Sequence, residues 1–320
     1  MVSVITTILN EVSNVGNFIE TLLQQSVEPD EIIICDGGSW DGTLDIVRSM
    51  ASEHSNIKVL VMPGANRSAG RNAAIVLANS EIVVCVDAGC SFTPDWLEKL
   101  LEPLSDECVS LAFGLCDAQV GNVFQECLSV FGAPRPEDID SSTFLPSSRS
   151  IAFRKEYWKK AGGYPEQYCK NEDTPFDIAL KKTGCRFALA KDAHFLWEPR
   201  RDFRELFRQQ YSYAQGDGEA RLFFPVYWKT SAFYFSVLLL TGIALVQKNY
   251  FFLLMPFLVF TGYHGRYFYR GVIRLNKKNI FWPMFEVITA MDAGNVFGFW
   301  KGYIRSIMHK GSFHIVKEQA

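Results

Sequence analysis

Short runs rich in β-branched residues alternate with amphipathic stretches along the first 115 residues of the chain. The predicted strands cover residues 2–9, 31–35, 57–62, 82–86 and 109–113. Helical patterns fill the intervals, at residues 15–25, 41–54, 68–78 and 94–101. This alternation predicts an α/β fold with a mostly parallel sheet that helices cover on both faces. Ligands of such sheets bind beyond the carboxyl ends of the strands, so the candidate site residues are those that follow each run.

The charge and the hydrophobicity divide the chain into two parts. Residues 1–200 carry 17 Lys and Arg against 28 Asp and Glu, whereas residues 201–320 carry 15 against 7. The stretches 231–246 and 249–263 of the basic part contain no charged residue, and Lys248 lies between the two stretches. The net charge of −3 predicts no nucleic-acid partner, and the 48% of hydrophobic residues excludes a disordered polymer. We therefore expect the acidic part and the basic part of the chain to lie in different environments.

The 8 cysteines all lie in the acidic part, and none forms a CxxC pair. Several lie inside apolar runs, so we expect reduced thiols in the core of a cytoplasmic domain rather than a disulfide or zinc framework. The first residues enter a strand-like segment directly, without the pattern of a signal peptide. Both features predict that this part of the chain lies in the cytoplasm.

Polar and glycine-rich segments follow the first two predicted strands. Residues 6–11 read TTILNE, and residues 35–43 read CDGGSWDGT. Gly37 and Gly38 allow a sharp turn close to a ligand, and Asp41 can cap the helix that follows. Taken alone, this segment favours a capped turn that binds nothing.

The order of the motifs resembles glycosyltransferase family 2, the inverting enzymes of the GT-A fold, and in particular its membrane-anchored members. The segments that carry the resemblance are SVIT through NE (residues 3–11), EIIICDGGSWDGT (31–43), GRNA (70–73) and DAG (87–89). The resemblance extends over about residues 1–215. A dehydrogenase is disfavoured because no GxGxxG follows the first strand.

The resemblance implies a nucleotide-sugar site at the strand ends. Thr6, Glu11 and Asp36 are expected to hold the nucleoside, since a carboxylate at a strand end can accept hydrogen bonds from the base and the ribose. Arg71 is expected to lie toward the nucleotide, with a surface or structural arginine as the alternative. Asp87 and Ala88 complete the donor site.

The metal motif departs from the family pattern. Family members usually carry a second aspartate where Gly89 stands, and that aspartate binds a divalent cation at the diphosphate. Asp87 alone, with diphosphate oxygens and water, can still hold Mg²⁺ or Mn²⁺. A cation-free site, in which arginines neutralise the diphosphate, is the alternative.

Two downstream segments are similar to the acceptor region of the family. The segment 144–153 leads to Gly162-Gly163-Tyr164, and its small serines leave room for a sugar, with an ordinary polar loop as the alternative. Arg149 is a candidate for binding the diphosphate or the acceptor. Glu172-Asp173 matches the Glu-Asp motif, and Asp173 is the predicted general base, with Glu172 beside it. Without the family context, this pair is more typical of a helix cap.

The segment 207–218 resembles the Q-x-x-R-W helix of membrane-bound members. Gln209 and Tyr213 stand in the places of Gln and Trp, and Ser212 replaces the usual arginine. Arg208 and its neighbours are candidates to replace that charge at the diphosphate or the acceptor.

The basic part predicts a membrane region. We expect a catalytic domain at 1–222 and a membrane region at 223–320, with transmembrane helices at about 226–246 and 249–265. Residues 280–304 predict an interfacial or re-entrant helix, because they contain charged residues. The positive charges after the second segment place both ends of the hairpin in the cytoplasm. A buried helical subdomain or a dimer interface is the alternative.

These features together predict an inverting glycosyltransferase of the cell membrane with a cytoplasmic catalytic domain. Its donor would be a nucleotide diphosphate sugar and its acceptor a lipid-linked molecule or a glycan. The competing hypotheses are a membrane-associated scaffold that binds the donor without turnover, which Gly89 and Ser212 suggest, and a soluble nucleotide-sugar enzyme of another type.

Overall fold

The computed structural model describes residues 1–168, 170–248 and 253–308 of the 320-residue chain. The chain forms two compact units. Unit 1 comprises residues 1–119 and 133–198, and unit 2 comprises residues 120–132 and the chain from residue 199 onward. The predicted end of the catalytic domain at residue 222 stays a prediction, and the structure groups residues 199–222 with unit 2.

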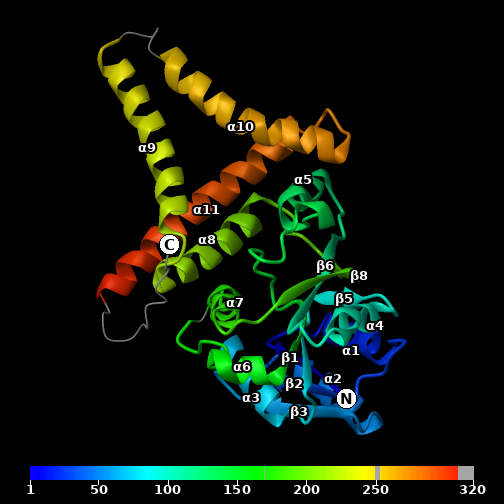
Figure 1. Ribbon diagram of the computed structural model, residues 1–320. Coiled ribbons are helices and arrows are strands. Elements are labelled where there is room, and N and C mark those ends of the chain that lie inside the picture. The colour runs from blue at the N-terminus through cyan, green and yellow to red at the C-terminus, as the bar shows by residue number, and fades with distance from the viewer. Residues whose placement is uncertain (169, 249–252, 309–320) are drawn as a thin grey trace. The chain divides into compact units, whose positions relative to one another are not determined.

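Unit 1 is built on a mixed sheet with the strand order β3-β2-β1-β4-β7-β6-β8-β5 (Figure 1). The strands are β1 (Val2–Ile8), β2 (Glu31–Asp36), β3 (Ile57–Val61), β4 (Ile82–Asp87), β5 (Cys90–Phe92), β6 (Leu111–Ala118), β7 (Ser150–Arg154) and β8 (Phe187–Trp197). β1 to β4 are parallel, whereas β7 is antiparallel to both β4 and β6, and β5 is antiparallel to β8. The predicted α/β class is confirmed, and the antiparallel strands make the sheet mixed.

Helices cover both faces of this sheet. They are α1 (Val15–Leu23), α2 (Thr43–Glu53), α3 (Arg67–Leu77), α4 (Trp96–Leu101), α6 (Lys155–Ala161) and α7 (Asp173–Lys182), with 3₁₀ turns at Glu102–Ser105 and Pro136–Asp138. Val4 in β1 packs with residues of α1, α2 and α4, and Ile5 beside it packs with residues of α3 and α7. Successive strand residues point to opposite faces, so one run of apolar residues serves two cores.

The sheet topology fixes where a ligand can bind. β1 pairs with β2 on one side and with β4 on the other, so the chain reverses its direction of winding at β1. In this register Ile8 lies opposite Asp36, and Thr7 lies opposite Asp87. The carboxyl ends of three parallel strands therefore meet at one edge, where open α/β sheets bind their ligands.

Unit 2 is helical. Its helices are α5 (Val123–Gly132), α8 (Phe203–Ala220), α9 (Phe224–Val246), α10 (Leu254–Leu275) and α11 (Phe281–Met308). Phe124 and Cys127 of α5 form a core with Leu206 of α8 and with Met284 and Val287 of α11. α8 and α11 lie side by side (Figure 1).

The membrane region is described in part. α9 is long and apolar enough to cross a membrane, and 6% of its most apolar 18-residue window is buried. Residues 249–252, where the second predicted span begins, lie outside the described residues, and the rest of that span falls in α10. The predicted interfacial segment 280–304 is part of the continuous helix α11. All three segments stay predictions.

The described cysteines are free thiols, and most of them are buried. Buried among them are Cys35, Cys85, Cys90, Cys127 and Cys185. Cys169 lies outside the described residues.

Candidate active site

Asp36 is the last residue of β2, and its two carboxylate oxygens differ. One accepts hydrogen bonds, and the other has no partner among the described residues. Its Oδ1 accepts hydrogen bonds from the backbone N–H groups of Gly38 at 2.8 Å and Ser39 at 2.9 Å. Gly38 has a φ of +100°, which lets the loop curl around the carboxylate. Asp36 is fully buried, and its Oδ2 has no partner among the described residues. Since a buried acceptor without a donor is costly, a ligand with N–H or O–H groups would complete this site.

Thr6 and Glu11 belong to β1 and to the loop that follows it. Thr6 is fully buried, and its Oγ1 has no partner in the described part of the chain. The backbone N–H of Glu11 donates to Thr43 Oγ1 at 2.8 Å, which ties the loop to the start of α2. Burial raises the pKa of the Glu11 carboxyl, although a hydrogen bond with Asn14 opposes the shift. Thr6 and Asp36 thus both offer a buried polar atom toward the predicted nucleoside site.

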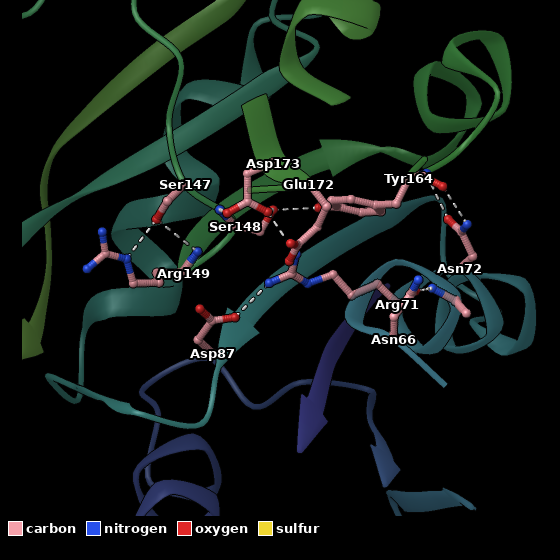
Figure 2. Close-up of polar contacts among 11 residues, drawn as sticks. Asn66, Arg71, Asn72, Asp87, Ser147, Ser148, Arg149, Tyr164, Glu172 and Asp173 are labelled. Carbon is pink, nitrogen blue, oxygen red and sulfur yellow. Dashed lines mark hydrogen bonds and ion pairs between the residues drawn. The ribbon is translucent and has the colours of Figure 1, made fainter. Parts of the chain in front are cut away.

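Arg71 joins three carboxylates within unit 1 (Figure 2). Its Nη2 donates to Asp87 Oδ1 at 2.8 Å, and its Nη1 donates to Glu172 Oε1 at 2.9 Å and to Asp173 Oδ1 at 2.8 Å. The arginine side chain is 1% exposed. Burial disfavours its charge, but the carboxylates of Asp173 and Asp87 outweigh that effect and raise the pKa of Arg71. The guanidinium therefore stays charged, and its predicted contact with the nucleotide stays a prediction.

Glu172 and Asp173 differ in their access to solvent. The Glu172 side chain is 3% exposed and that of Asp173 is 22% exposed. Burial and the charge of Asp173 raise the pKa of Glu172, with Arg71 opposing them. Asp173 is the first residue of α7. It is the accessible member of the pair, as a general base must be.

Ser148 fixes the orientation of the predicted base. Its Oγ donates to Asp173 Oδ1 at 2.7 Å, and its backbone N–H donates to Asp173 Oδ2 at 3.2 Å. The same Oγ lies 2.8 Å from Tyr164 Oη (Figure 2). The sequence pattern predicted only that this small residue leaves room for a sugar, and its hydrogen bonds to Asp173 were missed. The position of this serine in a polar segment after a proline carried no signal for them.

Asp177 is a further carboxyl that the motifs did not indicate. It follows Asp173 by one turn of α7, and both of its carboxyl oxygens are buried without a partner among the described residues. Burial and the charge of Asp173 raise the pKa of Asp177 well above its usual value. Asp177 therefore keeps its proton to a higher pH than a carboxyl in water does.

The end of β4 supplies one carboxylate toward a cation. The Asp87 side chain is 35% exposed, and its Oδ1 is engaged by Arg71. Ala88 is buried, and a Cβ added at Gly89 would meet no atom within 4 Å. Among the described residues, no group of three or more His, Cys, Asp or Glu side chains could hold a metal ion. The residues present therefore do not form a divalent-cation site by themselves.

Arginines surround Asp87 from different elements. Burial opposes the ionisation of Asp87, but the charges of Arg71, Arg67 and Arg149 outweigh it and lower the pKa of this carboxyl. Arg67 is the exposed first residue of α3 and was not predicted. It precedes Arg71 by one helical turn, and that spacing was the signal for a shared face.

Arg149 is stacked on an aromatic ring. Its guanidinium carbon lies 4.7 Å from the centre of the Trp197 ring, and its Nε donates to Ser147 Oγ at 2.9 Å. Trp197 ends β8, so this strand and the loop before β7 set the position of the guanidinium.

The remaining predicted residues lie on α8 in unit 2. Arg208 and Tyr213 are exposed, and Gln209 Nε2 donates to Tyr213 Oη at 3.2 Å. Ser212 lies on the same helix and is partly buried. The predicted roles of Arg208, Gln209 and Tyr213 stay predictions.

Comparisons with known proteins agree on one family. The family model described as Glycosyl transferase family 2 matches residues 3–163, which is half of the chain. The chain is 29% identical over 219 residues to the succinoglycan biosynthesis protein ExoA of Rhizobium meliloti. That match covers 65% of this chain and 66% of ExoA, just under two thirds of its length. The glycosyltransferase AglE of Haloferax volcanii is 25% identical over 229 residues, which are 67% of this chain and 72% of AglE.

A solved structure shows the same fold. The mannosyltransferase PcManGT from Pyrobaculum calidifontis, solved in complex with GDP-Man and Mn²⁺, matches with a TM-score of 0.59 at 18% identity. The match covers 94% of this chain and 86% of that protein. The predicted GT-A type of fold is thereby confirmed.

Proposed function

Because the chain belongs to glycosyl transferase family 2, we propose that it transfers a sugar from a nucleotide diphosphate sugar to a lipid-linked or glycan acceptor, with inversion. The accessible and oriented carboxylate of Asp173 carries this proposal. An inverting transfer needs a base on the face of the sugar opposite the leaving diphosphate. The name of ExoA, a succinoglycan biosynthesis protein, supports a glycan acceptor.

The nucleoside end of the donor is assigned to the edge formed by β1 and β2. The unpartnered oxygens Asp36 Oδ2 and Thr6 Oγ1 support this assignment, because base and ribose carry the N–H and O–H donors that these atoms lack. Glu11 lies in the loop after β1, where its charge interacts with that of Asp87. The donor diphosphate is assigned to the end of β4.

In the proposed reaction, Asp173 accepts the proton of the acceptor hydroxyl. The acceptor oxygen forms the new bond to the anomeric carbon as the bond to the diphosphate breaks, and the nucleotide diphosphate leaves. Arg71 and Ser148 hold Asp173 as the carboxylate that accepts the proton. Glu172 stays buried and supports the position of Arg71.

Use of a divalent cation remains a prediction for this chain. The manganese complex of PcManGT supports it. Mg²⁺ or Mn²⁺ would have Asp87 as its protein ligand, and diphosphate oxygens and water would have to supply the others. Such a cation neutralises charge on the diphosphate when it is bound.

We also propose that a hairpin of two helices, α9 and the segment at about 249–265, crosses the cell membrane with both ends in the cytoplasm, so that unit 1 faces the cytoplasm. Phe235, Leu238 and Val246 of α9 are 66%, 71% and 84% exposed, and lipid would cover these side chains. The basic residues that favour the cytoplasmic side are Arg266, Arg270, Arg274, Lys277 and Lys278. Release of the full chain from membranes by detergent but not by alkaline carbonate checks this; release by carbonate would contradict a span.

The variant Asp173→Asn tests the function. It keeps the shape of the side chain and one acceptor oxygen, but its amide nitrogen accepts neither a hydrogen bond nor a proton, so we expect turnover to fall about 10²- to 10⁴-fold. Binding of the donor, measured by protection against thermal unfolding, should remain. Glu172→Gln is the neighbouring control. Near-normal turnover of Asp173→Asn would refute the base, and donor binding without turnover by the wild type would favour the scaffold.

A further inference from the structure

The strand end that carries Asp87 brings little negative charge to attract a cation. Asp87 shares one oxygen with Arg71, and Gly89, two residues on, contributes no ligand. The space around position 89 is open, since a Cβ added there would meet no atom within 4 Å. Among the described residues, no atom fills the space that the side chain of a residue at position 89 would enter first. A diphosphate bound here needs positive charge from elsewhere.

Arg149 brings positive charge to this strand end. Val86 pairs with Ser150 across the antiparallel β4–β7 ladder, which places Arg149 opposite Asp87. The guanidinium therefore belongs to the segment that runs beside the end of β4. Figure 2 shows it on the same side of the site as Asp87.

Trp197 and Ser147 hold the Arg149 guanidinium in one plane. The ring of Trp197 lies under it, and Cys90 pairs with Trp197 in the β5–β8 ladder, beside Gly89. The hydrogen bond from Nε to Ser147 Oγ fixes its rotation. A planar guanidinium in a fixed orientation suits bidentate recognition of phosphate oxygens.

We propose that Arg149, stacked on Trp197, binds the diphosphate of the donor and supplies the positive charge that a cation held by a carboxylate at position 89 would otherwise supply. The proposal rests on the proposed function, since it concerns the donor of the same site. It implies that the site distinguishes a nucleoside diphosphate from a monophosphate in the absence of divalent cations.

The test measures binding rather than turnover. Full-length protein in detergent is titrated calorimetrically with UDP, UMP, GDP and GMP in excess EDTA. For the nucleotide that binds, we expect the diphosphate to bind about 10- to 100-fold more tightly than the monophosphate. Arg149→Gln should abolish that preference, whereas Arg48→Gln, at an exposed arginine of α2, should leave it unchanged. Trp197→Leu keeps the charge of Arg149 and removes the aromatic ring on which it is stacked. This variant should therefore reduce the preference for the diphosphate by less than Arg149→Gln does.

A second variant restores the carboxylate. In the background of Arg149→Gln, Gly89→Asp should recover the diphosphate preference when Mn²⁺ is added and not in EDTA, whereas Gly89→Asn should recover nothing. Equal binding of di- and monophosphate by the wild type in EDTA would overturn the role of Arg149. The same holds for a preference that survives Arg149→Gln but is lost in Arg67→Gln. Failure of every nucleotide to bind would instead overturn the proposed function, and the role of Arg149 with it.

Discussion

In unit 1 the buried Arg71 holds three carboxylates, whereas in unit 2 the contact between α8 and α11 contains glycines spaced four residues apart. The arginine is 1% exposed and makes ion pairs of 2.8 to 2.9 Å. At the helix contact, a Cβ added at Gly302 would lie 2.0 Å from Gln215 O, and one at Gly298 would lie 2.2 Å from Tyr211 O. One region depends on charge and the other on the absence of side-chain volume.

The two regions serve different purposes. The ion pairs in unit 1 position carboxylates for the proposed reaction, and the helix contact in unit 2 supports α8. Buried ion pairs rarely add stability compared with an apolar core, but removing one partner is strongly destabilising. The ion pairs of Arg71 therefore add little stability, but they hold the carboxylates where the proposed reaction needs them. Close backbone contact between helices costs little and gives rigidity through packing. α8, which carries Gln209 and Tyr213, is backed in this way by α11.

The largest effect is expected when the charge of Arg71 is removed. Arg71→Met leaves three carboxylates facing one another, so the free energy of unfolding should fall by about 3–5 kcal/mol. Urea unfolding of the full chain in detergent measures it. Arg48→Met, at an exposed arginine of unit 1, should change stability by less than about 0.5 kcal/mol.

Arg71→Lys keeps this prediction testable if Arg71→Met does not fold. A single ammonium cannot match the planar fork that reaches Asp87, Glu172 and Asp173, so a smaller loss of stability is expected. Wild-type stability of both variants would show that the charge cluster does not hold unit 1 together.

A smaller effect is expected at the helix contact in unit 2. Gly298→Ala places a methyl group against the Tyr211 carbonyl oxygen, and the helices must move apart, which costs about 1–3 kcal/mol. Gly265→Ala on α10 is the matched control, because a Cβ there meets no atom within 4 Å. Its better helix propensity should stabilise by about 0.5–1 kcal/mol. Equal effects of the two substitutions in thermal unfolding would mean that α8 and α11 are not in backbone contact.

Local patterns predicted the parallel half of the sheet well. Each of β1 to β4 begins at the predicted residue and ends within one residue of the predicted end, because apolar β-branched runs bounded by turns leave few alternatives. The antiparallel insertion of β7 between β4 and β6 was not predicted, because strand order depends on contacts between residues far apart in sequence. The glycines at positions 294, 298 and 302 were visible in the sequence, but their partner helix was not.

The carboxylates of the site could be predicted from the sequence, but the contacts that their side chains make could not. Asp36, Asp87 and Asp173 stand out because they follow predicted strands or precede a helix in a known order. The ion pairs of Arg71 with carboxylates 16, 101 and 102 residues away depend on the tertiary fold. The same is true of the stacking of Arg149 on Trp197.

The smallest effect is expected at Asp177, a buried acid whose pKa is raised and which lies beside the charged cluster of Arg71. Its pKa is raised on folding by burial and by Asp173, so between the unfolded and folded values the unfolded state loses its proton first. The unfolded state then binds fewer protons, and stability falls as the pH rises through that window. Asp177→Asn cannot ionise, so it should be more stable than wild type by about 1 kcal/mol at pH 7.5.

The difference should shrink as the pH falls toward about 4, the ordinary pKa of an aspartate, below which Asp177 keeps its proton in both states. Unfolding curves of the full chain at pH 4.5, 6.0 and 7.5 measure it, with Asp192→Asn at an exposed position of β8 as the control. A variant Asp177→Asn that is less stable than wild type by the same amount at every pH would mean that the acid is ionised and paired. The carboxylates of α7 would then all belong to the charged cluster, and the contrast between Asp173 and Asp177 would disappear.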